Sequence, residues 1–395
     1  MSVNNMDFEQ SAALLAAVAS QATGQTVAAA VDTTDFVTQA QTVLKTGYDR
    51  MTTAISQVLS YTIYSAREYL GSLRGMRVDG RKWGGIVRKI NYIDMPLVDD
   101  EVYSTATDAT LANYRFRKEN AIQTNFYGDT GFEQYTMFYK NQLDQAFTGP
   151  DEFGTYMSGL LTKINSQLEQ TFENTGRLVL CNLAAAKAVA DPNSVIHLLT
   201  EYNRETEQTL TATTVMQPAN YEPFMKWVAA RIETIKDLLK VRGTKWHVNP
   251  TTATPVGGYI QRHTPADRLK IYLNSGVLNN IQARVLTGLY NKEDFRMTDT
   301  EAVPFWQSPD APAQIIYKPN YIDSAGEVVE AENAVTMANV FGIMFDEEAA
   351  GWAVTDEWMG SNPWHAFRGI SNLVWHYHCR WWNDLTENAV VLMMN

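Results

Sequence analysis

The sequence has few of the residues and motifs on which catalytic or metal sites are usually built. It contains only two cysteines, Cys181 and Cys379, and neither belongs to a CxxC pair or to another spacing typical of zinc ligands. None of the motifs G-x-S-x-G, H-E-x-x-H and G-x-G-x-x-G occurs. These absences exclude a disulfide framework, and we expect a protein that is not an enzyme and needs no cofactor or metal.

The chain also lacks an excess of positive charge and a long apolar run. Its formal net charge is −12, whereas general nucleic-acid binding needs clustered Lys and Arg to neutralise phosphates. No apolar run approaches the roughly 18 residues of a membrane span. Asp7 and Glu9 stand where a signal peptide would carry basic residues. We therefore expect a protein that folds in a cytosol and has no membrane partner.

One long helical pattern dominates what is present. Apolar residues recur every three or four positions over residues 153–179, and over 180–190 they cover most of the helix circumference. Thr148 is the expected N-cap, Pro150 suits the first turn, and the pattern stops at Asp191. This predicts one helix of about forty residues, roughly 60 Å long. A plate-shaped subunit that must reach across a shell needs such a helix, and an enzyme core seldom does.

Two predicted strands, residues 86–95 and 121–138, flank a polar segment at 97–120. Strands joined by so long a polar tip form a projecting hairpin, which alone is marginally stable and would lean on a neighbouring subunit. Its charged residues are the candidate intersubunit contacts, namely Arg88, Lys89, Asp99, Asp100, Glu101, Arg115 and Arg117.

The rest of the chain mixes helices and strands without a regular βαβ repeat, which predicts an α+β fold. Helices are predicted at residues 8–18, 48–73, 220–242 and 277–290. Strands are predicted at residues 245–248, 268–273, 315–317, 339–345, 351–354, 373–382 and 388–394, and the polar segment 197–217 also favours strand.

The strand predicted at 373–382 holds the best candidates for metal ligands. His376 and His378 share one face of it, but Cys379 points to the opposite face, so these three cannot form a site together. His365 could supply a third ligand instead, which leaves a metal-dependent hydrolase as an alternative. Partly exposed structural histidines are the preferred interpretation.

The order of these elements resembles that of the major capsid proteins of tailed bacteriophages with the Hong Kong 97-like fold. Those proteins consist of an N-arm, an E-loop, a spine helix, an axial domain and a peripheral domain. Residues 85–94 (GIVRKINYID) resemble the first limb of the E-loop in short-tailed phages of the phi-29 type. The order of the family's C-terminal segment is followed by residues 342–347 (GIMFDE), 361–363 (SNP), 374–382 and 387–391 (ENAVV).

The resemblance implies a division of the chain into five parts. They are an N-terminal arm at 1–75, an E-loop with flanking strands at 76–140, a peripheral domain with the spine helix at 141–195, an axial domain at 196–330, and C-terminal strands of the peripheral domain at 331–395.

The resemblance also implies a function. It predicts a major capsid protein that self-assembles, as hexamers and pentamers, into an icosahedral shell around a double-stranded DNA genome. Such a virion protein would assemble in the host cytoplasm with a separate scaffolding protein and a portal, and would lie near packaged DNA without specific contacts. An encapsulin-like nanocompartment shell is the second interpretation, although it would be shorter and lack this hairpin tip and arm. A tail-tube protein would be smaller and richer in β structure.

Overall fold

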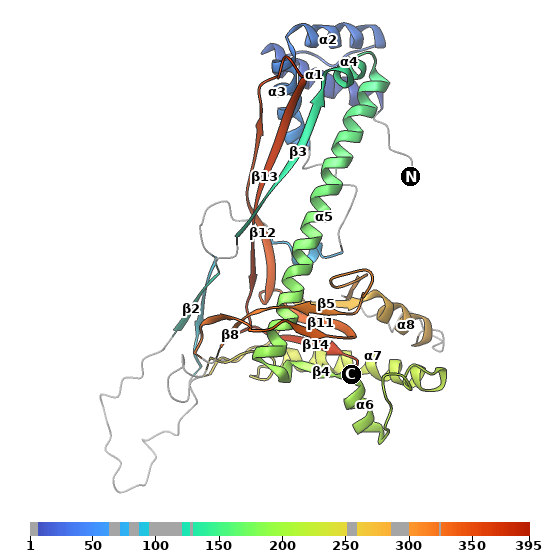
Figure 1. Cartoon of the computed structure of the whole chain (residues 1–395), viewed down its shortest axis with the longest axis vertical. Coiled ribbons are helices and arrows are strands. Elements are labelled where there is room, and N and C mark those ends of the chain that lie inside the picture. The colour runs from blue at the N-terminus through green and yellow to red at the C-terminus, as the bar shows by residue number, and fades with distance from the viewer. Residues whose placement is uncertain are drawn as a thin grey trace, which may run out of the picture.

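The computed structural model describes residues 7–62, 72–78, 87–94, 121–126, 129–250, 259–285, 300–323 and 325–395. Their long body is built along one helix, α5 (Pro150–Ala190), which has 41 residues. One end of α5 lies against the N-terminal helices, and the other end reaches a five-stranded sheet (Figure 1). The single long helix expected from the apolar periodicity is therefore confirmed.

Helix α5 begins and ends close to the predicted positions, but its N-cap differs from the expectation. The cap residue is Gly149, and Thr148 instead donates its hydroxyl to the carbonyl of Gln145 at 2.6 Å. Pro150 fits the first turn because its missing N–H would have no partner there. The helix ends at Asp191, whose N–H donates to the carbonyl of Lys187.

Three N-terminal helices pack on one another, and the first two of them also pack on α5. They are α1 (Phe8–Thr23), α2 (Thr33–Lys45) and α3 (Tyr48–Thr62). Asp7 and Asp32 cap α1 and α2, and the Phe36 ring contacts the rings of Phe8 and Phe153. No helix is predicted at α2 from the sequence, because threonine and other β-branched residues there weaken the helical preference.

A long three-stranded antiparallel sheet runs beside α5 (Figure 1). Its order is β12 (Ala350–Ser361), β13 (Ile370–Asn383) and β3 (Asp129–Tyr139), with the short helix α4 (Lys140–Ala146) after β3. Alternate residues of β13 are buried, as predicted, and Tyr377 meets the ring of Phe172 on α5 at 6.2 Å between centroids.

The five-stranded sheet separates two hydrophobic cores. Its order is β4 (Val195–His197), β14 (Ala389–Met393), β11 (Val340–Asp346), β5 (Leu269–Asn274) and β6 (Thr300–Val303). Ile343 and Phe345 join the core that contains α5, whereas Met344 and Leu392 join the core on the other face. Every residue of β11 and β14 is buried because both faces of the sheet are covered.

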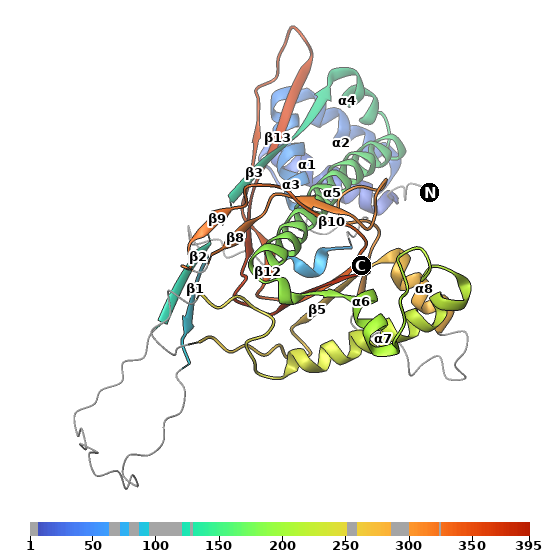
Figure 2. The same ribbon diagram turned by 60° about the horizontal axis from the view of Figure 1, so that its bottom comes forward.

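The second core is covered by α6 (Leu198–Thr206), α7 (Pro218–Lys240) and α8 (Ser275–Val285), which Figure 2 shows beside the sheet. The strand preference predicted for 197–217 is wrong, since α6 occupies its first part. The strand predicted at 245–248 is also wrong, because this segment forms turns. The carbonyl of Trp246 there accepts hydrogen bonds from the main chain of Ala389 and from the ammonium of Lys187. These two bonds take the place of the regular hydrogen bonds of a β-strand.

Smaller elements complete the described chain. Two antiparallel pairs, β7 (Ile315–Tyr317) with β10 (Val335–Met337) and β8 (Asn320–Ile322) with β9 (Val328–Glu330), pack near α5, and short 3₁₀ turns lie at Arg74–Met76 and Pro192–Ser194. Within the residues listed above as described, no helix combines the length and the apolar character needed to cross a bilayer.

Candidate functional site

The projecting hairpin is the first candidate site. Strands β1 (Val87–Tyr92) and β2 (Ala121–Phe126) pair antiparallel, so that Arg88 lies opposite Asn125. This pair extends away from the end of β3 (Figure 1). The antiparallel pairing agrees with the predicted hairpin for residues 121–126, but the single strand predicted at 121–138 is wrong, because β3 pairs with β13 in the three-stranded sheet. Five of the predicted contact residues lie outside the described residues, namely Asp99, Asp100, Glu101, Arg115 and Arg117.

The two faces of β1 have different surroundings. Arg88, Ile90 and Tyr92 point outward, and Ile90 and Tyr92 are 51% and 72% exposed. The alternate residues Lys89 and Asn91 point toward the body. Arg88 and Lys89, which the sequence analysis treated alike, therefore face opposite ways.

Lys89 makes ion pairs within its own chain. Its Nζ lies 2.9 Å from Asp384 and 3.1 Å from Glu348, and it also pairs with Glu387. Burial alone would lower the pKa of Lys89, but attraction to Asp384 and Glu387 outweighs burial and raises the pKa above its ordinary value. The lysine is thus held charged at the base of the hairpin. A contact between Lys89 and another subunit stays a prediction.

Two arginines attach the same strand to the body. Arg262 donates from Nη2 to the side-chain oxygen of Asn91 at 2.6 Å and from Nε to the carbonyl of Thr386 at 3.1 Å. Arg242 donates to both carboxylate oxygens of Asp94 at 2.7 and 2.6 Å. These partners are more than 120 positions apart in the sequence, so no local pattern could have indicated them.

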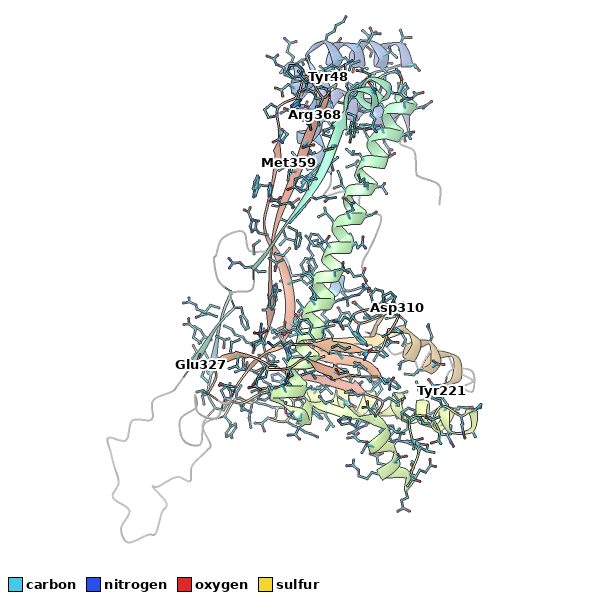
Figure 3. The ribbon with its side chains drawn as sticks, viewed as in Figure 1. Tyr48, Tyr221, Asp310, Glu327, Met359 and Arg368 are labelled. Carbon is cyan, nitrogen blue, oxygen red and sulfur yellow. The ribbon has the colours of Figure 1, made fainter. Side chains whose placement is uncertain are left out.

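The outward face of the three-stranded sheet is the second candidate surface. It exposes large side chains from β3 and β12, with Tyr135 61% and Trp358 49% exposed. The His376 ring stacks on Trp358 with centroids 3.6 Å apart, and its Nδ1 lies 3.4 Å from a carboxylate oxygen of Glu133. The sheet continues to the end of the molecule where Arg368 lies close to Tyr48, the first residue of α3 (Figure 3). Such an aromatic face on a monomer is typical of a binding surface.

The three histidines considered as metal ligands are not brought together. His365 lies in the turn between β12 and β13, where its Nδ1 accepts from the N–H of Arg368. His365 forms a bridge with Ile370, and His376 follows six residues later, about 20 Å along an extended strand. The described part of the chain, which includes all three histidines, holds no group of three or more His, Cys, Asp or Glu that could hold a metal ion.

A cavity of about 430 Å³ lies between β3 and α5. Amide and aromatic side chains line it, among them Phe132, Gln134 and Gln167, and the amide of Gln134 donates to Gln167 at 2.9 Å. Its lining also includes the carboxylate of Glu133 and the hydroxyl groups of Tyr135 and Thr171.

Comparison with known proteins bears on the fold. No family model and no curated protein matches the chain. Among solved structures, the capsid structure of Staphylococcus phage Andhra matches with a TM-score of 0.54 and 8% identity, over 84% of this chain and 86% of that chain. A chain in the structure of the head fibre and inner core protein gp22 of native bacteriophage P68 matches with a TM-score of 0.54 and 9% identity, over the same shares. The α+β, Hong Kong 97-like fold expected from the order of elements is therefore confirmed.

Proposed function

We propose that the protein is the major capsid protein of a tailed bacteriophage, one of many copies that form an icosahedral shell around a double-stranded DNA genome. The observation that carries the proposal is the match between the fold of this chain, over 84% of its length, and a phage capsid structure. The 41-residue helix α5 supports it, because a shell plate needs a stiff element that joins its two ends. No specific observation favours the encapsulin or hydrolase alternatives.

The proposed parts of the subunit keep the boundaries given above. The arm is 1–75, the E-loop region 76–140, the peripheral domain with its spine helix 141–195, the axial domain 196–330 and the C-terminal peripheral strands 331–395. In this division α1–α3 belong to the arm, and the C-terminal strands supply β11 and β14 to the five-stranded sheet.

Copies would join through the outward face of the hairpin. Arg88, Ile90 and Tyr92 offer one positive charge and two apolar side chains. The outward face of the three-stranded sheet offers the complement, with the aromatic Tyr135 and the acidic Glu133 both exposed. One exposed ion pair contributes under about 1 kcal/mol, so the shell would depend on many symmetric repeats of the contact. The charged tip residues, Asp99, Asp100, Glu101, Arg115 and Arg117, belong to the same proposal.

The finer expectations are part of the proposal too. They include hexamers and pentamers, a separate scaffolding protein, a portal, assembly in the host cytoplasm, the absence of enzymatic activity, and kinship with short-tailed phages of the phi-29 type. The net charge of −12 supports a surface that releases packaged DNA, because like charges repel.

Electron microscopy of the purified product tests the proposal. The full chain would be expressed with and without a co-expressed scaffold candidate, separated by size-exclusion chromatography and imaged by negative stain. Closed shells of regular diameter, or capsomers that close when scaffold is added, are the expected result. A monomer or dimer under every condition would overturn the proposal, and zinc bound stoichiometrically and lost in His376→Ala would favour the hydrolase.

A further inference from the structure

The loop between β13 and β14, residues 384–388, is held from two sides by two lysines. From α5, the Nζ of Lys187 donates to the carbonyls of Leu385 at 3.2 Å and Glu387 at 3.3 Å, and also to the carbonyl of Trp246 at 2.9 Å. From β1, the Nζ of Lys89 pairs with the side chains of Asp384 and Glu387. One lysine thus binds the main chain of the loop, and the other binds its carboxylates.

The loop is held in place by burial and hydrogen bonds, so the position of Lys187 on α5 constrains the position of Lys89 on β1. All five of its residues are buried. Asp384 accepts from the N–H of Thr386 at 2.9 Å and from its hydroxyl at 2.6 Å. Asn388 donates to the hydroxyl of Thr264 at 3.2 Å. A buried loop whose polar groups are bonded in this way has one preferred arrangement.

The hairpin has no comparable rigidity of its own. In the described chain β1 and β2 form a two-stranded sheet, and a two-stranded sheet in isolation is marginally stable. The polar contacts described for its inner face run through Lys89, Asn91 and Asp94. Of these three residues, Lys89 is the one that forms ion pairs with the loop. Its ammonium pairs with Asp384 and Glu387 of the loop, and also with Glu348.

We propose that Lys89 is a positioning residue that fixes the direction of the hairpin relative to α5, acting through loop 384–388 and Lys187. The inference deepens the proposed function, because the direction of the hairpin would set the angle at which neighbouring copies join. Glu348, in the turn between β11 and β12, strengthens the arrangement by pairing with both Lys89 and Arg268.

Spin-label distance measurement on the dilute, unassembled full chain tests the inference. Labels would be placed on the exposed positions Gln123 of β2 and Thr234 of α7, each changed to cysteine, since the native Cys181 and Cys379 are buried. Gln123 lies three residues, or about 10 Å, from Phe126 at the base of the hairpin, so a rotation of about 15° about that base moves it by roughly 3 Å. We expect Lys89→Met to broaden the distance distribution and shift its maximum by about this amount.

Three further variants make the result decisive. Arg88→Met removes the neighbouring charge from the opposite face and should leave the distribution unchanged. Lys89→Arg should restore a narrow distribution. Glu348→Gln removes one carboxylate partner of Lys89 without disturbing Arg262, which pairs with Glu387, and leaves Lys89 paired with Asp384, so it should give a smaller shift and decides the question if Lys89→Met fails to fold.

A Lys89→Met distribution that overlays the unmodified chain would overturn the inference, as would an equal shift in Arg88→Met. Neither outcome depends on whether shells form. The inference and the proposed function can therefore fail independently.

Discussion

The two ends of α5 illustrate how one helix performs two structural tasks. In its first half one face is buried, with Phe153, Met157 and Leu161 spaced at helical intervals, while Thr155 and Gly159 between them are exposed. In its last turns every residue from Val179 to Lys187 is buried. The first half is amphipathic and packs with one face on the sheet and the N-terminal helices. The last turns of the helix are surrounded by the hydrophobic core on every side.

The buried end of α5 also contains polar groups, and each of them needs a hydrogen-bond partner there. Asn182 accepts from the N–H of Asn320 at 3.1 Å, and Lys187 donates to three carbonyls. Burial of such groups is favourable only when each finds a partner. The comparison teaches that every side of α5 is constrained by packing where it meets the five-stranded sheet, whereas at the opposite end one side is constrained and the exposed side tolerates change.

Replacing Lys187 by methionine should produce the largest loss. The variant keeps the volume but removes the ammonium from three carbonyls, of which those of Trp246 and Leu385 keep a main-chain donor. Removing one partner of a buried charged network costs about 3–5 kcal/mol. Denaturant unfolding followed by far-UV circular dichroism measures the change. Lys45→Met, on α2 and exposed, is the control and should change the free energy of unfolding by less than about 0.5 kcal/mol.

The same residue gives a dependence on pH. Burial lowers the pKa of Lys187 to about 8, below its ordinary value of 10.5. Between these values the unfolded chain binds more protons than the folded chain, so the contribution of Lys187 to the free energy of unfolding rises with pH, by about 3 kcal/mol across the window. Unfolding curves of the unmodified chain and Lys187→Met should therefore diverge from pH 8 to 10.5, and parallel curves would contradict the assignment.

Truncating a leucine should cost much more at the buried end than on the exposed side of the same helix. Leu183 is fully buried, and Leu183→Ala should cost about 3 kcal/mol because it leaves a cavity. Leu178 is 54% exposed, and Leu178→Ala should cost less than about 0.5 kcal/mol. Denaturant unfolding measures both losses in the free energy of unfolding. Equal losses in the two variants would contradict the difference between the buried end and the exposed side of the helix.

Two glycines of α5 should respond in opposite directions to the same substitution. Nothing lies within 4 Å of a Cβ at Gly159, so Gly159→Ala should stabilise the helix by about 0.5–1 kcal/mol. A Cβ at Gly176 would lie 3.1 Å from Cβ of the buried Leu73, so Gly176→Ala should destabilise by about 1 kcal/mol. Thermal unfolding of both variants gives the sign, and a stabilised Gly176→Ala would show that the segment around Leu73 is loosely packed.

Much of the fold could be predicted from local pattern. The apolar periodicity of α5 and the alternation along β13 extend over enough residues to outweigh local exceptions. Helix α2 was missed because its stability comes from contacts such as Phe36 against Phe153, which the sequence pattern does not show. The turns at 245–248 were missed because they are set by a lysine 59 positions away.

The candidate site was predictable only in part. Strand alternation alone could have separated Arg88 from Lys89, since Lys89 shares its face with Asn91 and Ile93. The partners of Lys89 at Asp384 and Glu387 lie almost 300 positions away, and no local signal encodes such a contact.

Cross-linking between copies tests the central claim most directly, namely that subunits join through the outward face of the hairpin rather than through α5. Chains carrying Tyr92→Cys would be co-assembled with chains carrying Tyr135→Cys and treated with a short bis-maleimide, so that a mixed covalent dimer can form only between copies. We predict mixed dimers in assembled particles and none in the dilute chain, and none when Thr234→Cys replaces Tyr135→Cys. Particles that assemble yet give no mixed dimer would contradict the account.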